Sequence, residues 1–214
     1  MKKGLTELVF IIDRSGSMHG LENDTVGGFN SMIAKQREVS GEANITTVLF
    51  DDNYELLHNR IDLKCIKEMT GREYYVRGTT ALLDAIGKTI SMMGGVQKNL
   101  SKNNKAEKVL FIIITDGLEN ASREYSLNKV KGMIERQKSR YGWEFMFLGA
   151  NIDAVKTAED MGISGNRASN YRGDRKGTKL NYSVVSEAMA CYRECSQIDD
   201  DWNAELEKDL KERN

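Results

Sequence analysis

The chain has 214 residues, of which 40% are hydrophobic and 29% are charged, and its formal net charge is −1. This length suits one domain, or one domain with an appendage, and allows a substantial buried core. The near-neutral charge excludes a strong bulk attraction to nucleic acid or to an anionic membrane. No apolar run approaches the ~20 residues that span a bilayer. We therefore expect neither a nucleic-acid partner nor a membrane association.

The cysteines indicate a reducing compartment. Cys65, Cys191 and Cys195 form an odd set, and the residues after Met1 pass directly into a predicted strand rather than into the pattern of a secretory signal. An odd number of cysteines without such a signal is typical of reduced thiols. We therefore expect a cytoplasmic protein.

Strands and helices alternate in the first half of the chain. Strands are predicted where short runs are apolar on both faces, and helices where apolar residues recur every three or four positions. In chain order these are a strand at 8–12, a helix at 26–38, strands at 45–50 and 54–63, and a helix at 80–93. The turn-like Asp51-Asp52-Asn53 separates the second and third strands, which predicts a hairpin with an antiparallel edge strand.

The alternation continues in the second half. In chain order it predicts a strand at 109–114, a helix around 127–134, a strand at 145–148, and helices at 152–161 and 184–192. Ser126 is a candidate N-cap of the first of these helices, and Gly142 is a candidate residue just past its end. The order predicts an α/β fold, a doubly wound and mostly parallel sheet of about six strands with helices on both faces. We expect one domain over residues 1–196 and a charged, solvated helix or tail over 197–214.

Polar clusters follow two predicted strands and precede one helix. They are Asp13-Arg14-Ser15-Gly16-Ser17, Arg77-Gly78-Thr79-Thr80 and Thr115-Asp116-Gly117. In open α/β sheets, ligands bind beyond the carboxyl ends of the strands. If the clusters converge there, they offer carboxylates and hydroxyls but neither thiolate nor imidazole. Such an inventory favours a hard cation, Mg²⁺ or Mn²⁺.

These motifs resemble the metal-ion-dependent adhesion site (MIDAS) of von Willebrand factor type A (vWA) domains. The matches are DRSGS at 13–17, GTTAL at 78–82 and ITDG at 114–117. A wider likeness, to small single-domain proteins of bacteria and phages, covers most of the chain to about residue 195. It is carried by VGGFNSMIAKQ, YYVRGTTALLDAI and LGANIDAVKTAEDMGI.

The resemblance implies a role for each matched residue. Ser15, Ser17 and Thr80 would contact the cation through their hydroxyls, and Asp13 and Asp116 would bind it mostly through water. Thr79 replaces Thr80 if the loop is shifted by one residue. The implied cation is Mg²⁺, with Mn²⁺ or Ca²⁺ as alternatives.

The function implied is cation-dependent protein binding without catalysis. Neutral hydroxyl ligands leave the cation much of its charge, so it can accept an Asp or Glu carboxylate from a partner protein at an open coordination position. The chain has no G-x-S-x-G, Cys–His or HExxH arrangement, and we expect no enzyme. Two alternatives stay open, an Mg²⁺-dependent phosphohydrolase and a nucleotide-binding Rossmann-like domain. The pattern says nothing of the oligomeric state.

Other polar residues receive simpler interpretations. Arg14 and His19 are expected at the rim of the site, where a partner or solvent would contact them. Glu119 is a further candidate for the rim. Asp84 is expected on the surface of its helix, and the basic residues of 171–179 are expected in a solvated loop.

Overall fold

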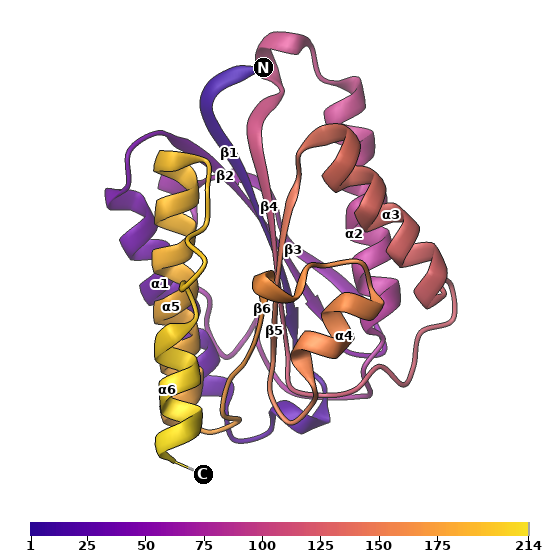
Figure 1. Ribbon diagram of the computed structural model, residues 1–214. Coiled ribbons are helices and arrows are strands. Elements are labelled where there is room, and N and C mark those ends of the chain that lie inside the picture. Colours follow the sequence, from indigo (N-terminus) through magenta and orange to yellow (C-terminus); the bar gives the residue numbers. More distant parts are fainter. Residues whose placement is uncertain (214) are drawn as a thin grey trace.

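The computed structural model describes residues 1–213 and contains a six-stranded sheet in the order β3-β2-β1-β4-β5-β6 (Figure 1). The strands are β1 Lys2–Asp13, β2 Glu42–Phe50, β3 Tyr54–Asp62, β4 Ala106–Thr115, β5 Glu144–Gly149 and β6 Ala168–Asn170. Neighbouring strands pair in parallel, except β2 and β3, which are antiparallel. The predicted α/β sheet with one antiparallel edge strand is confirmed.

Helices cover both faces of this sheet. They are α1 Glu22–Glu38, α2 Leu82–Asn99, α3 Leu127–Tyr141, α4 Ala154–Asp160, α5 Arg175–Cys195 and α6 Ala204–Glu212. Figure 1 shows α1, α5 and α6 on one face and α2, α3 and α4 on the other. Each face has its own apolar core, so the central strands are buried on both sides.

β1 is the strand that positions the candidate site. Phe10 and Ile12 belong to the core under α1 and α5, whereas Val9 and Ile11 belong to the core under α2 and α3. All four are 0% exposed, which explains the unbroken apolar run in the sequence. In the sheet, β2 lies on one side of β1 and β4 lies on the other, so the chain crosses over β1 between β3 and β4. The carboxyl ends of β1 and β4 therefore meet at the point where strand order reverses.

The structure differs from the sequence-based expectation in several elements. Helix α1 begins at Glu22, four residues before the predicted start. Helix α5 begins at Arg175, so the basic residues expected in a solvated loop partly lie in its first turns. Its N-cap is Asp174, whose carboxylate accepts a hydrogen bond from the Gly177 amide at 2.8 Å. The short β6 has no counterpart among the predicted strands, because its three residues are too few to produce a periodic pattern.

The helix α3 has the caps that the sequence predicts. The Ser126 hydroxyl accepts a hydrogen bond from the Lys129 amide at 3.4 Å. Gly142 follows the last helical residue with φ of 65°, in the left-handed region that glycine adopts without strain.

The charged C-terminal segment contains the helix α6, which packs against the protein rather than being solvated on all sides. Leu206 is 1% exposed and belongs to the core under α1 and α5. Lys176 of α5 donates to the buried Asp209 carboxylate at 2.7 Å. The division into a domain at 1–196 and an appendage at 197–214 stays a prediction. No helix among residues 1–213 has both the length and the apolar character to cross a membrane.

Candidate metal centre

Backbone hydrogen bonds join the three predicted loops at the carboxyl ends of β1 and β4. The Gly16 amide donates to the Gly78 carbonyl at 3.1 Å, which connects the loop after β1 to the loop before α2. The Asn120 amide donates to the Thr80 carbonyl at 3.0 Å, which connects the loop before α2 to the loop after β4. Three segments distant in the sequence are thus held side by side.

Hydroxyl groups from these loops form one cluster. The Ser15 and Ser17 hydroxyl oxygens lie 3.0 Å apart, and the Thr80 hydroxyl donates to Ser15 Oγ at 3.0 Å. The Ser17 hydroxyl donates to Asp116 Oδ1. Thr80 is 3% exposed, whereas Thr79 is exposed to solvent. The structure therefore places Thr80, not Thr79, in the cluster.

The two carboxylates beside the hydroxyls are buried. Asp13 Oδ1 accepts from the Ser15 amide at 2.7 Å, and Asp13 Oδ2 accepts from the Thr115 hydroxyl at 2.6 Å. Burial raises the pKa of Asp13, although these two partners act in the opposite direction. Burial also raises the pKa of Asp116 to about 6, opposed by the hydrogen bond from Ser17 and reinforced by the charge of Asp13.

This donor set fits a hard divalent cation. The convergent groups are all oxygens, and the hydrogen-bond partners of the two carboxylates are hydroxyls and backbone amides rather than cationic side chains. Gly117 leaves room beside them, since a Cβ there would lie 3.1 Å from Ser17 Oγ and 3.3 Å from Thr80 Oγ1. The structure brings together all five predicted residues, Asp13, Ser15, Ser17, Thr80 and Asp116, and their ligation of a metal stays a prediction.

Arg14 does not lie at the rim of the site, and that expectation is wrong. Its side chain is fully buried, with Nε donating to Asp51 Oδ2 at 3.0 Å and Nη1 lying 2.7 Å from Glu55. The Arg14 amide continues the β1–β2 ladder by donating to the Phe50 carbonyl, so the side chain meets the turn that follows β2. His19, in contrast, has a side chain 86% exposed, as expected at a rim.

Asp51 also holds the loops of the site together, a role that the sequence motifs do not indicate. Besides Arg14, it accepts from Arg77 Nε at 2.7 Å, and its backbone carbonyl accepts from the Ala81 amide at 2.9 Å. Burial alone would raise the pKa of Asp51, but hydrogen bonds from Arg77 and Asn53 and the charge of Arg14 hold it below its ordinary value. Asp51 thereby ties the Ser15 loop to the Thr80 loop. Its position at the end of a strand next to β1 was the available signal.

Asp84 is buried, which corrects the expectation of a surface position. Its carboxylate accepts hydrogen bonds from the backbone amides of Arg123, Glu124 and Tyr125 at 2.8–2.9 Å. The amides of residues 123–125 lie in the loop after β4, outside any helix or strand. The first turn of α2 faces this loop, so Asp84 supplies the hydrogen-bond acceptor that these amides need. Burial would raise the pKa of Asp84, but the three amides lower it below its ordinary value.

Glu119 also holds this loop to α2. Its carboxylate accepts from the Leu83 amide at 2.9 Å and from the Ser122 amide at 2.7 Å. The segment that follows Asp116 is therefore fixed by two acidic side chains, one from α2 and one from the loop itself. Both act on backbone geometry rather than on the candidate metal directly.

Comparison with known proteins identifies the fold. Neither family models nor curated proteins match the sequence. Among solved structures, the chain is similar to a von Willebrand factor type A protein from Catenulispora acidiphila, with a TM-score of 0.60 and 15% identity over 86% of this chain and 42% of that one. It is also similar to manganese-loaded TRAP of Plasmodium vivax, with a TM-score of 0.60 and 17% identity over 89% and 74% of the two chains.

A third similar structure is proximal thread matrix protein 1 from the mussel byssus, with a zinc-occupied MIDAS motif. Its TM-score is 0.59, with 12% identity over 86% of this chain and 46% of that one. The chain thus spans less than half the length of the Catenulispora and mussel proteins. These likenesses show that the chain has the vWA fold.

Proposed function

We propose that the protein is a non-catalytic module that binds another protein through a divalent cation. The observation that carries the proposal is the meeting of the Ser15, Ser17 and Thr80 hydroxyls with buried carboxylates where the strand order reverses. A divalent cation held mainly by neutral hydroxyls keeps much of its charge and attracts a further anionic oxygen. An aspartate or glutamate of the partner supplies that oxygen.

Each residue has a defined part in this proposal. When bound, the cation supplies a positive charge with an open coordination position. The Ser15, Ser17 and Thr80 hydroxyls bind it directly, while Asp13 and Asp116 act through water. Thr115 and the Ser15 amide fix the orientation of the Asp13 carboxylate, so that it does not compete for the open position.

The cation we propose is Mg²⁺, with Mn²⁺ and Ca²⁺ as alternatives, because hydroxyls and carboxylates suit hard ions. The Plasmodium vivax neighbour is manganese-loaded, and the mussel neighbour has zinc in its MIDAS motif. These two structures support a divalent cation without selecting among the ions. A cytoplasmic location and a bacterial or phage origin are further parts of the proposal.

The absence of catalysis is supported by the groups around the serines. His19 is the nearest histidine in the chain to Ser17, and its exposed ring lies 3.4 Å from Glu22 rather than on a serine. Among residues 1–213, no group of at least three His, Cys, Asp or Glu side chains has the arrangement to hold a metal.

Calorimetric titration with MgCl₂ and MnCl₂ tests the proposal. We expect Asp13→Ala, Ser15→Ala and Asp116→Ala to lose at least about tenfold in cation affinity, which corresponds to about 1.4 kcal/mol. Asp200→Ala is the matched control, because its side chain is 92% exposed and distant in sequence from the site. Circular dichroism checks that each variant is folded. Unchanged affinity in all three variants refutes the metal assignment.

A further inference from the structure

A polar cavity lies on the other side of the loop that carries Thr80. Its volume is about 360 Å³, and its lining includes Thr79 and Ala81, the two residues that flank Thr80. Thr80 itself points toward Ser15. One short loop therefore separates the candidate metal centre from this cavity.

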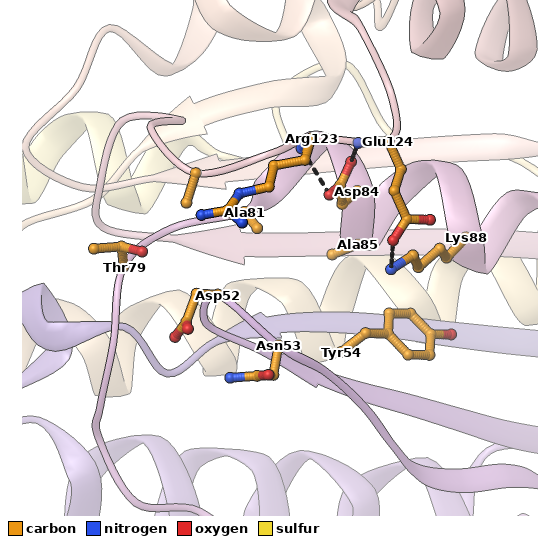
Figure 2. A pocket seen from close by; sticks show the side chains of 11 residues that line it. Asp52, Asn53, Tyr54, Thr79, Ala81, Asp84, Ala85, Lys88, Arg123 and Glu124 are labelled. Atoms are coloured by element: carbon orange, nitrogen blue, oxygen red, sulfur yellow. Dashed lines mark hydrogen bonds and ion pairs between the residues drawn. The ribbon is translucent and has the colours of Figure 1, made fainter.

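Most of the charged groups of the cavity are already satisfied. The Asp84 carboxylate accepts three backbone hydrogen bonds, and Lys88 forms an ion pair with Glu124 at 2.7 Å. Figure 2 shows this pair at one end of the cavity and the Arg123 guanidinium near Ala81 at the other. Arg123 is exposed, and within residues 1–213 no side-chain hydrogen bond or ion pair is found for its guanidinium. Its fork of donors is thus available to a ligand.

The backbone that carries Arg123 is fixed in advance. Its amide donates to Asp84 Oδ2 at 2.9 Å, and the following two amides bind the same carboxylate. The preceding Ala121 and Ser122 amides donate to Glu119. A ligand therefore has to order only the Arg123 side chain and not the loop, which lowers the entropic cost of binding.

We propose that this cavity is a second subsite for the partner, in which Arg123 binds an acidic side chain close in sequence to the acid that meets the cation. The inference rests on the proposed function. Guanidinium groups bind carboxylates through paired hydrogen bonds. Arg123 follows Ala121 by two residues, at most about 7 Å of chain, and the Ala121 amide donates to the Thr80 carbonyl at 3.3 Å. An acid two residues from the first adds at most about 7 Å of partner chain, and the acid and Arg123 side chains extend that reach.

Asp52 gives the cavity a negative wall opposite Arg123. It lines the opposite wall, is exposed, and lies beside Gly78, where an added Cβ would be 2.0 Å from Asp52 Oδ1. Its negative charge repels a bound acid most strongly at that wall, so the acid lies at Arg123 rather than beside Asp52. Removal of the Asp52 charge is therefore expected to strengthen binding of an acidic ligand.

Peptide binding in MgCl₂, measured by NMR titration, tests the subsite. The probes are a short glycine peptide with one glutamate, the same peptide with a second glutamate two residues on, and a version with glutamine at the second position. We expect the second glutamate to raise affinity about fivefold in the wild type, and the glutamine less than about twofold, consistent with one charge-assisted contact. Arg123→Gln should abolish the gain, Asp52→Asn should enlarge it, and Arg140→Gln, an exposed arginine of α3, should leave it unchanged.

The outcomes separate the two proposals. An equal gain from the second glutamate in Arg123→Gln and in the wild type overturns the subsite. So does an equal gain from glutamine. A failure of the magnesium-loaded protein to bind any of the three peptides contradicts the proposed function together with the subsite. Binding of the peptide with one glutamate that EDTA does not weaken contradicts the proposed function instead, whatever the variants do.

Discussion

The substitution Asp51→Asn tests whether a buried carboxylate holds the loops of the site together. The change removes one charge but keeps the size of the side chain and one carbonyl oxygen. Arg14 and Arg77 both donate to Asp51 Oδ2, at 3.0 and 2.7 Å. In the variant this position carries either a neutral oxygen or an amide group, and the fully buried Arg14 loses its principal counter-charge.

The expected destabilisation follows from these contacts. Removing one partner of a buried ion pair costs about 3–5 kcal/mol, because the remaining charge is left in a poorly solvated place. Glu55 still lies 2.7 Å from Arg14 Nη1, which offsets part of this loss, and the side chain of Arg77 is 42% exposed and can be solvated. We therefore expect a loss of about 3 kcal/mol in the free energy of unfolding. For a chain of this length that lowers Tm by roughly 6–12 °C.

Urea unfolding followed by circular dichroism measures this loss. Asp52→Asn is the matched control, since it makes the same chemical change in the next residue, which is exposed. It should alter stability by less than about 0.5 kcal/mol. The cation affinity of Asp51→Asn should also fall, because Ser15 and Thr80 lie on the loops that Asp51 joins. A change of less than about 1 kcal/mol in Asp51→Asn would show that the buried network does not hold these loops.

Other contacts give further predictions. Asp84→Ala should destabilise the protein by about 2 kcal/mol and speed hydrogen exchange at residues 123–125, whose amides lose their acceptor; unchanged exchange contradicts this role. Leu206 is 1% exposed, which indicates that α6 is packed, so Leu206→Ala should lower the free energy of unfolding in urea by about 3 kcal/mol. A loss below about 1 kcal/mol indicates a solvated helix instead. The pKa values of Asp51 and Asp84 are lower in the folded state than their ordinary value of 3.8. Both carboxylates therefore stabilise the folded state at pH values above 3.8, and this contribution is lost as the pH falls through their folded-state pKa values. The acid-induced loss of stability should therefore be smaller in Asp51→Asn, and an identical pH profile argues against the assignment.

The sheet could be predicted because its pattern is local. Phe10, Ile12 and their neighbours form a continuous apolar run, and such a run indicates a strand buried on both faces wherever it lies in the chain. The predicted cluster at the carboxyl ends of β1 and β4 follows from the same argument, since parallel strands bring their carboxyl ends to one edge. The pattern does not predict β6, because Ser169 and Asn170 leave only one apolar residue in a strand of three.

The buried charges are harder to predict than the strands, because burial of a charge depends on a partner distant in the sequence. Arg14 is 37 positions from Asp51, and Asp84 is 39 from Arg123. Nothing within a few residues of Arg14 or Asp84 reveals these pairs, and isolated charged residues are usually exposed. Motif spacing suggests the five residues of the proposed site, whereas it does not suggest the residues that position them.

Anomalous diffraction from crystals soaked in MnCl₂ tests the central claim most directly. We predict one strong peak at about 2.2 Å from the hydroxyl oxygens of Ser15, Ser17 and Thr80, with Asp13 and Asp116 reached through water. A peak held by other residues, or the lack of a peak at this edge of the sheet in crystals that remain ordered, would contradict it.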